Sequence, residues 1–509
     1  MIALCQEHRM EHRTKHIALR YFILVDSLNT SGANIVDGMW IFRVNRPPSS
    51  PPVFKARYVA RGFSQQQGVD FFKIFSPTPK MTTLRVLLLV AAQRDYELHS
   101  LDFSTAFLQG SLQEEIWLRR TPGFTGSFLA VADLVTHLRT SDARYRTAVP
   151  AEFLPTNQPP MFITLYFIVT RLPDSLRSVR DHFLTLDPTS LNVDLLEQHL
   201  LAAETSAVAV GTRWSLRRPV YGLRQAPREW HDTLRTTLAA LGFAPSTADP
   251  SLFLRTDTSL PPFYVLVYVD DLVFATADTE ELTLVKSELQ KRHTCTGLGE
   301  LRSYLGLHIT RDRARRTITL TRSHMVHQVL QRFGFQYSSP QLTPLSTSHS
   351  LSAPPSDESV EPSGPTSGMG LVLGGRGPVV LTGHADASWV DDSATQRSSQ
   401  GYTFSLGSGS VSWRSTRSSS VLISSCEAEI YARAMAAQEL RWLTYLLTDL
   451  GEQPRSPPVL YQHGQLCLAY MATRANTADV FTKALPPSDH EHFATVLGLV
   501  PTLPHLLSA

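Results

Sequence analysis

The sequence has few cysteines, almost no excess of positive over negative charge, and no long apolar runs. Its four cysteines are scattered along 509 residues: Cys5, Cys295, Cys426 and Cys467. This scatter fits neither a disulfide framework nor a zinc knuckle. Apolar runs such as 84–92 are too short to cross a bilayer, so we expect no membrane partner. The first residues lack the pattern of a secretory signal, which predicts an intracellular protein that is not secreted.

Net charge decides little here. The chain carries 47 Lys and Arg against 45 Asp and Glu, a formal charge of +2, which neither requires nor excludes nucleic acid. Hydrophobic residues make up 42% and charged residues only 18%, so most of the chain should be globular. The length fits about three domains.

Two stretches rich in proline and serine indicate connectors. Residues 46–52 predict a stiff turn before a strand, and residues 345–368 predict a flexible interdomain linker. Periodicity predicts helices and strands on both sides of the second connector. The helices are expected over 84–95, 323–333 and 427–450, a strand–turn–strand over 263–275, and strands over 380–389, 401–406 and 410–413.

Asp270 and Asp271 stand side by side between two apolar, β-rich runs, 263–267 and 272–274. On a hairpin turn the two carboxylates repel each other unless cations lie close. A solvent-exposed turn is the simpler interpretation, since aspartate is common in turns. Asp102 ends a strand-like segment and supplies a third carboxylate, which completes the usual ligand set for two Mg²⁺ ions. Such a metal pair activates a primer 3′-hydroxyl in phosphoryl transfer.

Several motifs, in order, resemble the reverse transcriptase of copia-type (pseudoviral) LTR retrotransposons. They are Lys55–Phe63, Phe75–Arg85, Tyr221–Trp230, and Leu298–Leu301 with Tyr304–Gly306. The resemblance implies the α+β palm and fingers of a right-hand polymerase. It also implies an RNA template, a DNA primer, deoxynucleoside triphosphates and two Mg²⁺ ions in the active site.

The same resemblance assigns roles to individual residues. The catalytic metal ligands would be Asp102, Asp270 and Asp271. Four nucleotide-binding residues are implied: Lys55 and Arg57 at the triphosphate, Phe107 under the sugar, and Gln225 lining the site. Simpler interpretations remain open, with Arg57 as a surface charge, Phe107 as core and Gln225 as an ordinary helix residue.

The C-terminal part resembles the ribonuclease H domain of the same elements, an α/β fold that acts on an RNA–DNA hybrid. The matching segments are 382–389, 424–432 and 476–483. The resemblance implies Asp386, Glu429 and Asp479 as catalytic residues and as ligands of a second Mg²⁺ pair. Glu427 competes with Glu429 for its role.

The chain departs from the family pattern in several places. An acidic Asp-Asn turn and the helix behind it are missing after residue 461, while similar sequence to that helix occurs at residues 2–22. Residues 129–211 resemble a helical gag segment inserted into the palm. The thumb and connection expected after residue 365 are largely missing, and Gly297 stands where the family usually has aspartate.

These observations predict seven segments. They are 1–24, a displaced ribonuclease H-like helix segment; 35–128, fingers and first part of the palm; 129–211, the gag-like insertion; 212–344, second part of the palm; 345–368, the linker; 369–488, an incomplete ribonuclease H-like domain; and 489–509, a tail.

Three functional hypotheses follow. The first is an RNA-directed DNA polymerase with a degraded ribonuclease H, located in a cytoplasmic particle or the nucleus. The second is an inactive remnant that at most binds nucleic acid or gag-like capsid partners. The third, a capsid-like assembly module centred on 129–211, rests on the shortest segment.

Overall fold

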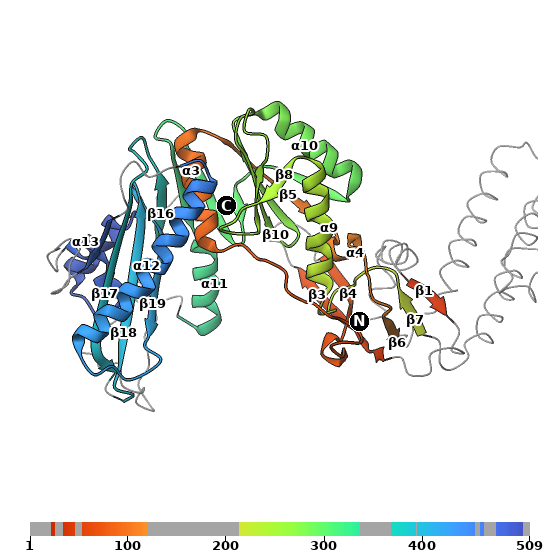
Figure 1. The fold of residues 1–509 in the computed structure, drawn as a ribbon, viewed down its shortest axis with the longest axis horizontal. Coiled ribbons are helices and arrows are strands. Elements are labelled where there is room, and N and C mark those ends of the chain that lie inside the picture. The colour runs from red at the N-terminus through yellow and green to blue at the C-terminus, as the bar shows by residue number, and fades with distance from the viewer. Residues whose placement is uncertain are drawn as a thin grey trace, which may run out of the picture. The chain divides into compact units, whose positions relative to one another are not determined.

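A computed structural model describes residues 22–25, 34–45, 53–119, 213–335, 368–392, 394–452, 459–462 and 475–501 (Figure 1). The predicted insertion at 129–211 and nearly all of the predicted linker at 345–368 lie outside these ranges. Contacts divide the chain into two compact units. The first comprises residues 1–76 and 107–233, and the second comprises 77–106 and 234–509.

The first unit contains two small sheets. One has the strand order β1-β7-β6-β2, with bounds β1 Phe22–Val25, β7 Arg213–Leu216, β6 Trp117–Arg119 and β2 Ile35–Val36. The other is the hairpin of β3 Gly38–Asn45 and β4 Val53–Ala60, followed by the short helix η2 Gly62–Ser64. Helix α4 spans Ala106–Gln109, and α9, Ala226–Ala240, continues into the second unit.

The second unit is built on a six-stranded sheet of order β12-β5-β11-β10-β9-β8. The strands are β5 Glu97–Phe103, β8 Phe243–Pro245, β9 Leu252–Arg255, β10 Phe263–Tyr268, β11 Asp271–Thr276 and β12 Cys295–Glu300. Helix α10, Thr279–Arg292, follows β11 directly, and the Asp278 carboxylate caps it by accepting from Glu281 N. Strands β5 and β11 are central, so the segments around residues 102 and 271 lie side by side.

Two further sheets complete the second unit. The five-stranded sheet has the order β13-β14-β15-β16-β21, and the four-stranded sheet β19-β18-β17-β20. The first uses β13 Ser303–Tyr304, β14 Leu307–Asp312, β15 Thr317–Thr321, β16 Met369–Gly374 and β21 Leu499–Pro501. The second uses β17 Leu381–Asp392, β18 Arg397–Leu406, β19 Gly409–Arg417 and β20 Val459–Gln462.

Helices cover or connect these sheets. Their bounds are α11 Ser323–Phe333, α12 Ser425–Asp449, η7 Thr477–Phe481 and α13 Pro487–Val496. The long helix α12 lies along β17 and β18, where its apolar side is covered (Figure 1). Among the described helices, none is both long and apolar enough to cross a membrane.

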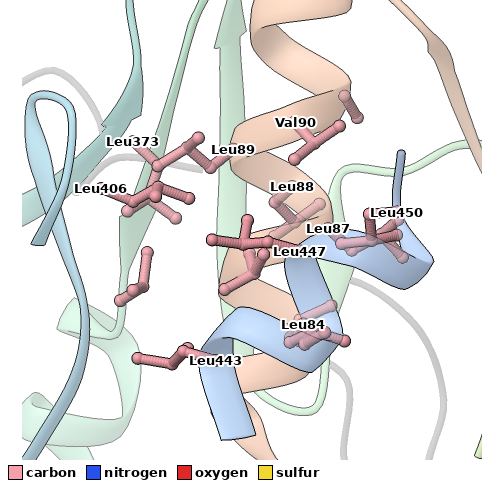
Figure 2. Packing of buried hydrophobic residues seen from close by; sticks show 14 of the residues in the cluster. Leu84, Leu87, Leu88, Leu89, Val90, Leu373, Leu406, Leu443, Leu447 and Leu450 are labelled. Atoms are coloured by element: carbon pink, nitrogen blue, oxygen red, sulfur yellow. The ribbon is translucent and has the colours of Figure 1, made fainter. Parts of the chain in front are cut away.

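Helix α3, Met81–Arg94, is the centre of the core of the second unit. Ten of its residues are buried, as expected of a helix that is hydrophobic on nearly all sides. Figure 2 shows Leu84, Leu87 and Leu88 packed with leucines of α12, and the same cluster contains residues of β10, β11 and β16. The Asp249 carboxylate accepts hydrogen bonds from Lys80 N and Thr83 Oγ1, placing an acid at the helix N-terminus, where it is favourable.

The helices and strands predicted from periodicity are confirmed, whereas residues 22–24 of the predicted helix segment 1–24 form a strand. The helix predicted over 323–333 is α11, the predicted strand–turn–strand is β10–β11, and the long helix predicted over 427–450 is α12. At the end of the predicted displaced segment, Phe22–Val25 form strand β1, paired with β7 of the first unit. Residues 1–21 lie outside the described ranges.

Candidate active site

The adjacent aspartates lie on a tight hairpin. Strands β10 and β11 pair so that Tyr268 stands opposite Asp271, which leaves Val269 and Asp270 as a two-residue turn. Val269 has φ +56°, and Asp270 does not have a positive φ; this sign pattern is that of a type II′ turn. A β-branched residue in this region is strained. The turn therefore places Asp270 at the hairpin tip, while the preceding Val269 adopts a backbone conformation that valine disfavours.

Asp102 faces this hairpin from the neighbouring strand. β5 pairs antiparallel with β11, with Asp102 directly opposite Asp271. Alternate residues of β11, Val273 and Ala275, lie in the core around α3, so strand alternation puts Asp271 on that same face. One face of the sheet therefore has an apolar end under α3 and a carboxylate end at the hairpin.

Charge accumulates at the carboxylate end. Burial first, and then the nearby Asp270 and Asp102 carboxylates, raise the pKa of Asp271 to about 6. The three acids are half-buried close to one another, which costs free energy, and a divalent cation would offset that cost. The donor chemistry therefore fits Mg²⁺, which prefers carboxylate oxygens.

The three carboxylates are not arranged as a complete metal-coordination site. Across the described ranges, no group of three or more His, Cys, Asp or Glu side chains is gathered closely enough to hold a metal ion. The Asp270 and Asp102 carboxylates lie near enough to raise the pKa of Asp271, yet the three side chains are not gathered closely enough to coordinate one Mg²⁺ ion together. Because like charges repel, ion binding would have to draw the side chains together.

Tyr304 borders this cluster and was not singled out by the sequence. Its side chain is 5% exposed, and within the described chain its hydroxyl makes no hydrogen bond. Burial, and then the Asp271 carboxylate, raise the pKa of Tyr304. Tyr304 belongs to one of the motifs named above, but nothing in that motif predicted that its hydroxyl would be buried near acids.

In the first unit, Gln225 is fully buried at the start of α9. Its Oε1 accepts from Gln65 Nε2 at 3.0 Å, and its Nε2 donates to the Asp70 carbonyl at 2.8 Å. Gln65 Oε1 in turn accepts from Arg224 N at 2.8 Å. These bonds tie the segment after η2 to the segment before α9. Contact between Gln225 and a nucleotide stays a prediction.

Two glycines let the same segments meet. Gly222 has φ +93°, and a Cβ on it would lie 2.0 Å from the Ala60 carbonyl oxygen. A Cβ on Gly62 would lie 2.1 Å from the Gly222 oxygen. Ala60 N donates to the Tyr221 carbonyl at 2.8 Å across this contact, and Arg224 Nε donates to Gly62 O at 2.7 Å. Only glycine fits at both positions.

The other predicted nucleotide-binding residues also belong to the first unit. Phe107 is half-buried, with its ring centroid 4.7 Å from that of Tyr221. Lys55 and Arg57 lie two positions apart on β4, opposite Arg43 and Ile41 of β3. Their side chains are outside the described part of the chain, so their contact with a triphosphate stays a prediction.

A second carboxylate group lies on β17 and η7. Asp386 and Asp479 are 1% and 2% exposed, and Lys483 Nζ lies 3.2 Å from Asp386 Oδ2 and 3.4 Å from Asp479 Oδ1. Thr482 Oγ1 also donates to Asp386 Oδ2. Burial, and then Asp386, raise the pKa of Asp479 to about 6. Lys483 stands four residues after Asp479, and it was not predicted as a site residue.

Helix capping distinguishes Glu427 from Glu429. Ser424 Oγ accepts from Glu427 N at 3.1 Å, and the Glu427 carboxylate accepts from Ile423 N at 2.8 Å. This reciprocal arrangement is close to a capping box and gives Glu427 a structural task at the start of α12. Glu429, half-buried one position beyond the buried Ala428, stays the predicted ligand.

Comparison with known proteins agrees with this architecture. Residues 21–129 and 182–347, more than half of the chain, match the family described as reverse transcriptase (RNA-dependent DNA polymerase). The chain is 25% identical over 468 residues to a retrovirus-related Pol polyprotein from transposon TNT 1-94 of Nicotiana tabacum, covering 81% of this chain and 29% of that one. It is 25% identical over 553 residues to that from transposon RE2 of Arabidopsis thaliana, covering 92% and 32%.

The chain spans about a third of the length of these curated relatives. A solved foamy viral protease-reverse transcriptase in complex with double-stranded DNA aligns with a TM-score of 0.33 and 12% identity, covering 89% of this chain and 64% of that one. The family match leaves out residues 130–181, which fall inside the predicted insertion. The boundaries of that insertion stay a prediction.

Proposed function

Because this chain belongs to the reverse transcriptase family of copia-type transposon polyproteins, we propose that its six-stranded sheet is a polymerase palm that extends a DNA primer on an RNA template. The observation that carries the proposal is the pairing of Asp271 with Asp102, with Asp270 in the adjoining turn. The raised pKa of Asp271 supports it, because a site that concentrates acids is suited to divalent cations.

In this proposal Asp102, Asp270 and Asp271 hold the ions. Mg²⁺ bound there would lower the pKa of the primer 3′-hydroxyl and neutralise charge on the leaving pyrophosphate. The β10–β11 turn carries Asp270, and the β5–β11 pairing sets Asp102 opposite Asp271. With ions bound, these positions would supply the alignment on which in-line phosphoryl transfer depends.

Four residues would contact or position the nucleotide. Lys55 and Arg57 on β4 would bind the triphosphate, with Arg suited to paired phosphate contacts. Phe107, packed on Tyr221, would lie under the sugar of the deoxynucleoside triphosphate. Gln225 would act indirectly, since its amide holds the segment of Gln65 and Asp70 in place.

The decisive test is Mg²⁺-dependent primer extension on an RNA template. We expect extension by the wild type and none by Asp270→Asn/Asp271→Asn, with Asp257→Asn, an exposed loop aspartate, as the matched control. A folded wild-type protein that extends no primer would overturn the proposal. It would favour the inactive remnant, whose test is retained binding of a template–primer duplex.

We also propose that β17–β20 with α12 form an incomplete ribonuclease H-like domain, with Asp386, Glu429 and Asp479 as the residues that would hold a second Mg²⁺ pair. The Lys483 ammonium lies against both Asp386 and Asp479, so a cation binding there must compete with it. We therefore expect weak cleavage of an RNA–DNA hybrid. Hybrid cleavage that is strong and survives Asp386→Asn would contradict this assignment.

A further inference from the structure

A cavity of about 510 Å³ lies in the second unit, and none of the carboxylates described above is among its lining residues. It opens between the start of α3, strands β14 to β16, strand β19 and helix α13. Its lining is mostly apolar and includes Leu320, Leu371, Trp413, Phe481, Arg85 and His490. None of these residues has a role in the proposed polymerase or hybrid cleavage. The volume is in the range of sites that enclose a small organic molecule.

The polar groups of this cavity are all basic or neutral. Arg85 and Arg322 line it together with His490, and no aspartate or glutamate is among the lining residues. Burial lowers the pKa of His490, which keeps its imidazole neutral at pH 7. The cavity therefore has a positive potential that its own lining does not neutralise.

Arg85 is the most informative of these residues. Its Nη1 donates to the Val411 carbonyl at 3.0 Å, and its guanidinium lies 3.8 Å from the centroid of the Trp413 ring. Within the described chain the Arg85 guanidinium forms no ion pair with a carboxylate. Burial lowers the pKa of Arg85 to about 10, so the side chain is still charged at pH 7. A largely buried cation satisfied by one carbonyl and one ring is an unusual arrangement, because buried charges are normally paired.

We propose that this cavity is a binding site for a small amphipathic anion, an aromatic or aliphatic acid whose carboxylate pairs with Arg85. The guanidinium has further N–H donors in a planar fork that matches a carboxylate. Trp413 and the leucines of β15 and β16 provide the apolar surface for the body of such a molecule. The ligand would contact α3 and β19 together, and would thereby stabilise the second unit.

The test uses 1-naphthaleneacetate as probe and its neutral amide as the matched ligand, titrated calorimetrically into the full chain. We expect the acid to bind at least about tenfold more tightly than the amide, since only the acid can form the charged pair. In Arg85→Met the acid should lose about tenfold in affinity and no longer be preferred. Arg85→Lys should retain part of the preference.

Two further variants secure the result. Ala494→Leu places a larger side chain in the lining and should weaken the acid and the amide alike, even if Arg85→Met proves too unstable to measure. Arg315→Met removes an arginine whose side chain is 83% exposed and should leave both affinities unchanged. The proposal is wrong if the folded wild type binds neither ligand, if it binds them equally, or if Arg85→Met and Ala494→Leu both leave binding unchanged.

Discussion

Asp271 stands directly opposite Asp102 across the central strands β11 and β5. Cross-strand partners are close neighbours, and like charges there destabilise the pair. Asp270 adds a third charge from the hairpin turn. The sheet is therefore less stable at the place where the proposed chemistry requires cations. The free energy of unfolding, with and without cations, measures this effect.

Asp271→Asn should make the metal-free protein more stable while abolishing primer extension. The shift in the pKa of Asp271 from its ordinary 3.8 to about 6 corresponds to about 3 kcal/mol, and solvent screening of this half-exposed group leaves roughly 1 kcal/mol. Urea unfolding in EDTA measures the gain. A variant that is less stable than the wild type would contradict the electrostatic interpretation.

The pH dependence of stability should have a defined sign at this site. Because the folded pKa of Asp271 lies above its unfolded value, the native state binds more protons between about pH 4 and 6, and stability falls as pH rises through that window. Saturating Mg²⁺ should flatten this fall. Comparing thermal unfolding of the wild type and Asp271→Asn from pH 4 to 7, with and without Mg²⁺, isolates the contribution.

Gly222→Ala should be among the most damaging single substitutions in the first unit. The added Cβ meets the Ala60 carbonyl oxygen at 2.0 Å, and φ +93° is strained for alanine, so we expect a loss of about 3 kcal/mol or more. Gly242→Ala is the matched control, since φ is +84° but no atom lies within 4 Å. It should lose only about 1 kcal/mol, from backbone strain alone. Equal losses would mean that the close approach is unimportant.

Lys483→Met should destabilise the second unit more at pH 8 than at pH 5. Asp386 and Asp479 are buried, and removing their cation leaves two uncompensated carboxylates, a loss of roughly 2 kcal/mol. Since burial and Asp386 already raise the pKa of Asp479, protonation at low pH relieves the repulsion. Lys483→Arg should keep most of the stability. A loss independent of pH would show that Lys483 acts through packing.

Val269→Asn should stabilise the hairpin by about 1 kcal/mol, because asparagine tolerates a positive φ far better than a β-branched residue. Val269→Ala should give a smaller gain. Both variants keep the turn length, so the Tyr268–Asp271 register should persist. Chemical denaturation measures the gain, and primer extension shows whether the valine matters for activity.

Much of the second unit could be predicted because its elements have strong local patterns. The apolar runs on either side of Asp270 and Asp271 predicted the hairpin, and the periodicity of 323–333 predicted α11 with its observed bounds. The sequence suggested Asp102 as a third carboxylate beside Asp270 and Asp271, but not the strand register that sets it opposite Asp271. Alternation along a strand says which residues share a face, but not which strand lies next to it.

Other features had no local signal. Periodicity identified α3 as a helix, yet a helix that is apolar on nearly all sides does not indicate which surfaces cover it. The burial of Gln225 and its bonds to Gln65 and Asp70 depend on a contact between distant segments. Likewise, the pairing of Lys483 with Asp386 joins residues that only the folded sheet brings together.

The order of strands in the six-stranded sheet also has a consequence during synthesis. β5 is complete about 170 residues before its neighbour β11 leaves the ribosome, and at typical elongation rates this delay lasts roughly 10 to 30 s. Throughout that interval a strand with the apolar residues Leu98, Leu101 and Phe103 has neither of its native partners, since β12 comes later still. Any sequence inserted between residues 102 and 271 lengthens this exposure, so chaperone demand and aggregation of nascent chains should rise with insertion length.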